Sequence, residues 1–134
     1  MKREILKAIE LHDSELAAIS CVNGATMFSL SPAYVHRSSG RAGRDTGLGW
    51  WQEGTLTIAG ASISAAIQLP ATISDGSLRI AGELHDNCIP AAGTFDGPIE
   101  LQLLFDTSEK LMIRGERLTV ELRGEPSGLE DFSP

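Results

Sequence analysis

The residues best suited to bind a ligand lie in one glycine-rich and arginine-rich segment, residues 31–51. Arg37, Arg41 and Arg44 are spaced three or four residues apart among glycines. His36 directly precedes the first arginine. Glycines allow backbone N–H groups to converge on an anion, and a guanidinium group binds phosphate or carboxylate through two hydrogen bonds. This composition indicates a site for a small anionic ligand.

The same segment also has a structural interpretation, which we favour. Residues 31–51 show no internal periodicity, so we predict one long loop. Such a loop can cover an open sheet edge, and its arginines then pair with the protein's own carboxylates or reach a second subunit. The segment lacks the terminal Gly-Lys-Ser/Thr of a phosphate-binding loop, and no G-x-G-x-x-G opens a helix there. The anionic ligand therefore remains the alternative.

Two adjacent tryptophans, Trp50 and Trp51, mark the end of this segment. Neighbouring residues on a strand point to opposite faces of the sheet. We expect one tryptophan to enter the core and the other to lie near the surface. The outer ring is a candidate for contact with a partner or a ligand.

The tetrapeptide Glu-Leu-His-Asp occurs twice and places His12 beside Asp13 and His85 beside Asp86. Imidazole and carboxylate groups could together hold a divalent cation, or act as a general base with an orienting acid. Side chains at adjacent positions of an extended chain diverge, and nothing in the sequence brings the two copies together. We therefore expect the aspartates to cap turns and the histidines to pack at sheet margins, with no metal and no cofactor.

The composition excludes several classes of partner. The chain has 134 residues, with 11 Lys and Arg against 18 Asp and Glu, giving a net charge of -7. Binding to nucleic acid or to an anionic membrane needs clustered cations, so neither is expected. Residues 51–134 carry thirteen acidic and five basic side chains, which suits either solubility or a basic partner protein.

No long apolar stretch or signal-like N-terminus is present, so a cytoplasmic protein is expected. The two cysteines, Cys21 and Cys88, lack metal-type spacing and are interpreted as reduced structural thiols.

Alternation of apolar and polar residues predicts β-strands along most of the chain. Residues 16–22 and 25–30 form a predicted hairpin, because Asn23-Gly24 accepts the positive φ of a tight turn. The further alternating stretches are residues 55–58, 62–67, 77–80, 99–105 and 117–123. Turn residues separate them at Asp75-Gly76, Asp96-Gly97-Pro98 and Asp106-Thr107-Ser108.

These patterns predict one mainly β domain over residues 1–134. We expect an antiparallel β-sandwich or partly open barrel of about 7–9 short strands. Ile5, Leu6 and Ile9 have helical spacing, which predicts a short N-terminal helix within residues 2–11. The acidic stretch 124–134 is rich in Gly and Pro, so we predict an irregular tail.

Three stretches resemble a group of small uncharacterised β-rich bacterial proteins: LHDSEL at residues 11–16, the segment 34–51, and HDNCIP at residues 85–90. The LHDSEL opening is also similar, over about a dozen residues, to immunity-type proteins encoded beside bacterial toxins. The resemblance implies bacterial origin and a cytoplasmic β domain, and it carries over no catalytic residue.

The common enzyme motifs are absent, although catalytic groups assembled from distant strands leave no local pattern, so enzyme activity stays open. The leading hypothesis is a non-catalytic protein-interaction module that forms a homodimer or binds another protein. One alternative is a binder or hydrolase of a small anionic ligand held by the arginines. A second alternative is an immunity-type protein that neutralises a toxin.

Overall fold

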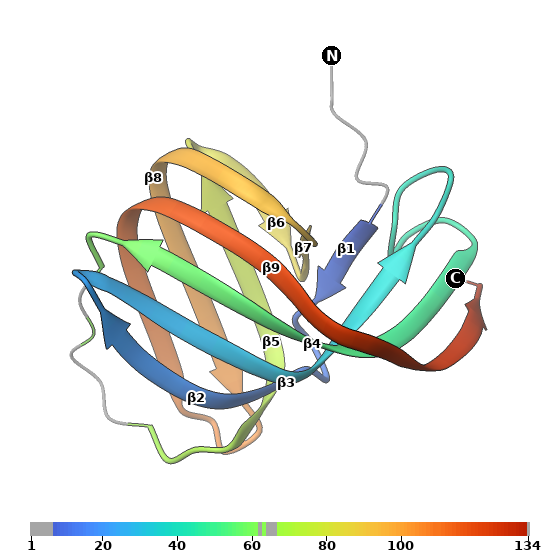
Figure 1. Cartoon of the computed structure of the whole chain (residues 1–134), viewed down its shortest axis with the longest axis horizontal. Helices are drawn as coiled ribbons and strands as arrows, with labels where there is room; N and C mark the ends of the chain where they lie inside the picture. The colour runs from blue at the N-terminus through green and yellow to red at the C-terminus, as the bar shows by residue number, and fades with distance from the viewer. Residues whose placement is uncertain (1–6, 62, 64–66, 134) are drawn as a thin grey trace.

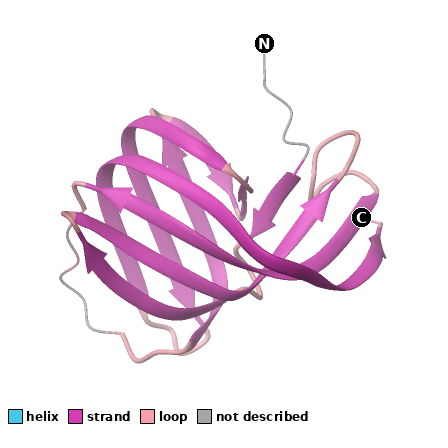
Figure 2. Cartoon of the chain, viewed as in Figure 1, coloured by secondary structure: helices cyan, strands magenta, loops and turns pink. Residues whose placement is uncertain are grey.

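The computed structural model describes residues 7–61, 63 and 67–133, and this part of the chain is built from strands and turns without a helix (Figure 2). The strands are β1 (Lys7–Glu10), β2 (Glu15–Val22), β3 (Ala25–Arg37), β4 (Gly47–Ala59), β5 (Ala71–Ile80), β6 (Glu83–Asp86), β7 (Cys88–Pro90), β8 (Gly93–Phe105) and β9 (Lys110–Phe132). The predicted mainly β class is confirmed. None of the described residues belongs to a helix that is long and apolar enough to cross a membrane.

All strand pairs are antiparallel, and they form one curved sheet in the order β2-β5-β8-β9-β4-β3-β1-β7, with β6 added to β5. The sheet curls back on itself because β2 also pairs with β3. On its other edge β2 meets β5 through only two residue pairs, Glu15↔Thr72 and Leu16↔Ala71. The result is the predicted partly open barrel.

The long strands β3, β4 and β9 pass beyond the barrel and form a second region, which we call the arm (Figure 1). The arm consists of β1, β7, residues 33–37 of β3, the turn 38–46, residues 47–52 of β4 and residues 127–132 of β9. Because β3, β4 and β9 run through both regions, the arm is a continuation of the sheet.

The core is formed by apolar side chains that alternate along the barrel strands and point inward. Phe28, Leu56 and Phe105 are among the largest side chains that are fully buried. Burying one such side chain contributes about 1.5–3 kcal/mol. Ile9, Val35 and Trp50 extend the same hydrophobic cluster into the arm.

The hairpin predicted at Asn23-Gly24 is confirmed. The turn joins β2 to β3, and its two central residues have φ of 49° and 78°. Both angles lie in the left-handed region that a tight two-residue hairpin requires.

The predicted N-terminal helix is wrong within the described residues, since Lys7–Glu10 forms β1. This strand pairs with β3 on one side and with β7 on the other. Ala8 and Ile9 are both fully buried, so adjacent residues use both faces of the strand. Short helices are marginal alone, and two strand edges satisfy more backbone groups. Residues 2–6 of the prediction lie outside the described residues.

The long loop predicted over residues 31–51 is also wrong. β3 continues to Arg37 and β4 begins at Gly47, which leaves a turn of residues 38–46. Val35 and His36 are adjacent and both buried, so β3 is covered on both faces at these positions. A strand covered on both faces loses apolar-polar alternation, which explains why the sequence pattern did not reveal it.

The tail predicted as irregular is instead the end of β9, which pairs with β4 as far as Gly47↔Phe132. The glycines that suggested a tail, Gly124 and Gly128, have φ of 74° and 64°. The pairing register with β4 shifts in this stretch, as at a β-bulge. Glycine here marks irregular pairing within a strand.

Two of the three predicted turns are likewise bulges. Asp75-Gly76 and Asp96-Gly97-Pro98 lie inside β5 and β8, each at a register shift. The third turn, residues 106–108, does connect β8 to β9. In the predicted strand 62–67, Ile63 and Ile67 belong to no strand, and residues 62 and 64–66 lie outside the described residues.

Candidate functional site

The arm contains a cluster of polar and aromatic side chains centred on His36. This histidine is only 1% exposed, and its Nε2 lies 2.8 Å from Oε1 of Glu10. Its ring packs edge-to-face on Tyr34 and Phe132, with centroid separations of 4.9 and 4.5 Å. Nδ1 of His36 is buried and has no hydrogen-bond partner among the described residues. The imidazole therefore joins β1, β3 and β9 at one point.

Tyr34 connects this cluster to Glu130 on β9, at one edge of the arm. Its hydroxyl donates a hydrogen bond to Oε1 of Glu130 at 2.5 Å, across β4. Its ring lies over Gly49, where any Cβ would overlap the phenol oxygen. Burial, then the hydrogen bond and negative charge of Glu130, raise the pKa of Tyr34 to about 12. The phenol is a hydrogen-bond donor at neutral pH.

Cys88 lies opposite Glu10 in the pairing of β7 with β1. Burial and the charge of Glu10 raise the pKa of its thiol to about 11, although the nearby Arg44 acts in the opposite direction. The turn packs closely against this thiol, because a Cβ on Gly43 would lie 2.6 Å from Sγ. The thiolate is the nucleophilic form, so the local environment disfavours nucleophilic attack by Cys88.

The turn 38–46 presents two of the predicted arginines on a well-defined backbone. The carbonyl of Arg41 accepts hydrogen bonds from the N–H groups of Arg44 and Asp45, at 3.0 and 2.8 Å. The carboxylate of Asp45 accepts a hydrogen bond from the N–H of Arg41 at 2.6 Å. Ser38 is buried, and its hydroxyl donates to the carbonyl of Thr46 at 2.9 Å.

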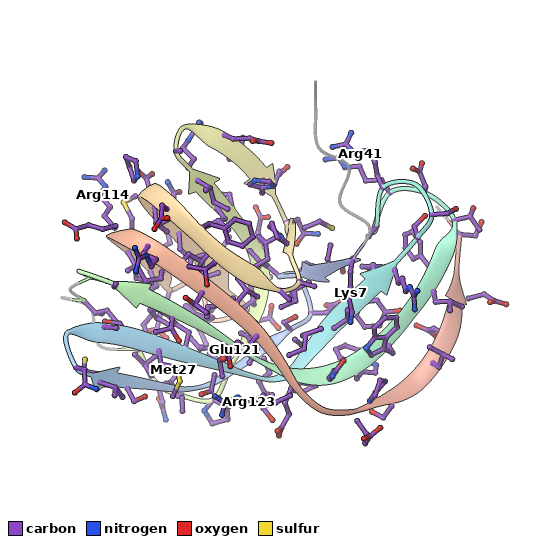
Figure 3. All side chains as sticks on the ribbon, turned by 45° about the horizontal axis from the view of Figure 1, so that its top comes forward. Lys7, Met27, Arg41, Arg114, Glu121 and Arg123 are labelled. Carbon is purple, nitrogen blue, oxygen red and sulfur yellow. The ribbon has the colours of Figure 1, made fainter. Side chains whose placement is uncertain are left out.

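The three arginines remain exposed, and none forms an ion pair with a carboxylate in the part of the chain that the structure describes. Lys7 lies across the strand pair from Arg37, with its Nζ 5.6 Å from the centroid of Trp50. Figure 3 shows Arg41 on the turn and Arg114 at the far end of the barrel. The predicted pairing of the arginines with the protein's own carboxylates is therefore not found.

A pocket of about 320 Å³ lies elsewhere and is lined by residues of β5, β6, β8 and β9. Ser77, Gln102 and Met112 line it, and charged groups of Asp75 and Lys110 flank it. The candidate arginines are not among its lining residues. This pocket gives no support to an anion site built by Arg37, Arg41 and Arg44.

The prediction for the two tryptophans is confirmed. Trp50 is 6% exposed and belongs to the core cluster, whereas Trp51 is only partly buried. Trp51 packs edge-to-face on Tyr34 with a centroid separation of 4.7 Å. The outer tryptophan thus joins the aromatic cluster of the arm.

The two His-Asp pairs are not brought into one cluster. Oxygen and nitrogen atoms of Glu10, His12 and Asp13 lie within 4.8 Å of one another, and this group does not include His85 or Asp86. Both His12 and Asp13 are exposed.

Asn87 directly follows the second Glu-Leu-His-Asp copy and forms hydrogen bonds with the first copy. Its backbone carbonyl accepts from the N–H of Leu11, and its side-chain oxygen accepts from the N–H of His12, each at 2.8 Å. The backbone N–H group of this turn is therefore capped by Asn87, which has a positive φ of 65°, and the cap was expected from Asp13 or Asp86.

Several residues of the cluster were missed by sequence reasoning. Glu10, Tyr34, Glu130 and Phe132 come from three strands, and the Tyr34–Glu130 contact joins positions 96 residues apart. The repeat Glu-Leu-His-Asp drew attention to His12 and Asp13, while its first residue, Glu10, makes the buried contact.

Comparison of the chain with protein-family models, with curated proteins and with solved structures gives no match.

Proposed function

We propose that the protein is a non-catalytic protein-interaction module and that the arm is its contact surface. The observation that carries the proposal is the group of arginines on and beside the turn. Exposed guanidinium groups in a chain with a net charge of -7 would find many carboxylates to pair with, yet Arg37, Arg41 and Arg44 pair with none that the structure describes. Arginine is enriched at protein interfaces, where its planar group makes several hydrogen bonds.

The chemistry of the cluster supports binding over catalysis. The two groups that could act as nucleophiles, the thiol of Cys88 and the phenol of Tyr34, have pKa values raised to about 11 and about 12. Both are therefore protonated at neutral pH. His36 is buried between aromatic rings and a carboxylate, away from bulk water.

Site-specific cross-linking tests where the protein makes contacts. A photo-cross-linking amino acid replaces exposed Thr46 on the turn of the arm, and in a control protein it replaces exposed Leu84 on the barrel. In cells of the native host, we expect a defined cross-linked species from position 46 and none from position 84. Equal cross-linking at both positions, or none at either, would contradict the proposal.

A charge-matched pair of variants tests the role of the arginines. Arg37→Gln/Arg41→Gln/Arg44→Gln removes three cations from the arm, and Arg79→Gln/Arg114→Gln/Arg123→Gln removes three exposed cations from outside it. We expect only the first variant to lose the cross-link at position 46. Loss in both would indicate a net-charge effect without a specific surface.

A small anionic ligand is the second candidate, and the same unpaired guanidinium groups favour it. Calorimetric titration with inorganic phosphate and with citrate tests this function directly. Saturable binding that is lost in Arg37→Gln/Arg41→Gln/Arg44→Gln and kept in the control variant would favour a ligand. The immunity-type alternative would be supported if the cross-linked partner were a toxin whose activity this protein abolishes.

A further inference from the structure

We propose that the partner of the arm is a second copy of this chain, in a two-fold symmetric dimer. Arg41 and Arg44 of one copy would lie against Glu130, Tyr34 and Trp51 of the other. This inference rests on the proposed function and names its partner. It follows from two complementary surfaces that the same arm carries on opposite edges.

The first surface is the basic turn. Arg41 and Arg44 are exposed, and the backbone that carries them is held by hydrogen bonds between Arg41, Arg44 and Asp45. The turn is anchored on the arm by buried Ala42 and by Gly43, which packs against Cys88 and His36. A cation displayed on an ordered backbone loses less conformational entropy on binding than one on a free loop.

The second surface is acidic and aromatic. Glu130 is exposed and forms no ion pair with a lysine or arginine among the described residues. Its carboxylate holds the hydroxyl of Tyr34, and Tyr34 packs on the partly buried Trp51. A guanidinium group is attracted both by a carboxylate and by the face of an aromatic ring. This surface therefore suits an arginine side chain.

The order of strands places these two surfaces at opposite edges of the arm. Across the arm the strands follow the order β9-β4-β3-β1-β7. Glu130 lies on β9, at one edge, while the turn that carries Arg41 and Arg44 packs through Gly43 against Cys88 on β7, at the other edge. Glu10, Tyr34 and Glu130 share one face, because Tyr34 pairs with Glu10 and bonds to Glu130.

A two-fold interface requires a patch that is complementary to itself. When two such faces meet about a two-fold axis that runs parallel to the strands, each basic edge lies over the acidic edge of the other copy. The basic edge of each copy then contacts the acidic edge of the other, and both contacts lie in the same interface. A partner carrying only basic or only acidic groups would satisfy one edge and leave the other unpaired.

A charge-exchange experiment tests the dimer. The mass in solution of the full chain is measured by light scattering and by sedimentation over a range of concentrations, at low and at high salt. We expect a dimer that weakens with salt, since exposed charge pairs are screened. Arg41→Glu/Arg44→Glu and, separately, Glu130→Arg should each raise the dissociation constant by about tenfold or more.

The decisive experiment mixes these two variants. In the mixed dimer, the new glutamates of one chain face the new arginine of the other, and the native Arg41 and Arg44 face a native Glu130. Both contacts are restored, so the mixture should form a heterodimer that neither variant forms alone. Reversals outside the arm, Arg79→Glu/Arg114→Glu and Glu121→Arg, should leave the dissociation constant within about twofold.

The milder variants Arg41→Gln/Arg44→Gln and Glu130→Gln remove the charges without reversing them. They test the contact in case a charge reversal unfolds the protein. They should weaken the dimer with unchanged far-ultraviolet circular dichroism. A chain that stays monomeric, or a mixture that fails to associate, overturns the dimer. The broader interaction function would still stand if position 46 then cross-linked to a different protein, and it would fall if nothing cross-linked there.

Discussion

Tyr34 is the only tyrosine in the chain, so its phenol can be titrated alone by tyrosinate absorbance. We expect a midpoint near the pKa of about 12 that burial and Glu130 impose. Glu130→Gln removes the negative charge and should lower the midpoint toward the ordinary value of 10.0. Circular dichroism at each pH shows whether the fold persists. A wild-type midpoint near that ordinary value in the folded protein would contradict the Tyr34–Glu130 contact.

The same shift has a consequence for stability. The pKa of Tyr34 is higher in the folded chain than in the unfolded one, so folding favours the protonated phenol. This contribution is complete below a pH of 10.0 and is lost as the pH rises toward about 12. Tyr34→Phe should remove this part of the pH dependence in urea unfolding.

The two thiols should react at different rates. Cys21 is exposed, whereas Cys88 is partly buried and has a pKa raised to about 11. With Ellman's reagent at about pH 8, we expect one thiol to react quickly and the second only after unfolding. Cys21→Ser should remove the fast phase, and Cys88→Ser should keep it. Two fast thiols in the folded protein would contradict the packing of the turn on Cys88.

At the scale of elements, the last part of β9 should stabilise the arm. Phe132→Ala removes a ring that packs on His36, and we expect a loss of about 1–2 kcal/mol in the free energy of unfolding, below the cost for a fully buried ring. Leu129→Ala is the matched control, because this side chain is 64% exposed, and its effect should stay within about 0.5 kcal/mol. Urea unfolding followed by tryptophan fluorescence measures both. Equal effects would mean that residues 127–132 contribute no specific packing.

The sequence predicted the barrel better than the arm, for a physical reason. Barrel strands have one face in the core and one in water, so alternation identifies residues 99–105 and 117–123 directly. In the arm β3 is covered on both faces at Val35 and His36, and two adjacent buried residues give no alternating pattern. Glycines there allow close approach, as where Tyr34 crosses Gly49, yet in sequence they resemble a loop.

The candidate site was predicted only in part. The arginines and the outer tryptophan were identified from residue type and adjacency, which are local properties. The contacts that organise the site, Glu10 with His36 and Tyr34 with Glu130, join residues 26 and 96 positions apart. Side-chain contacts across several strands depend on register, which one sequence does not specify.

At the scale of the whole molecule, the barrel has one weak seam. β2 and β5 share two residue pairs, whereas β3 and β4 pair along nearly their whole lengths. We expect the backbone amides of this seam to exchange with solvent through local opening, faster than those of β3, β4 and β9. Hydrogen exchange followed by NMR measures this order. Uniform protection of the seam and of β4 would contradict it.

The described chain both starts and stops on the arm, as Figure 1 shows, with β1 and the end of β9 in the same region. An affinity tag or fluorescent fusion attached at either of those positions would therefore crowd the surface assigned to binding. The Asn23-Gly24 hairpin lies at the end of β2 and β3, remote from the arm, and its residues are exposed. An epitope inserted there would give laboratories a handle that leaves the recognition surface accessible.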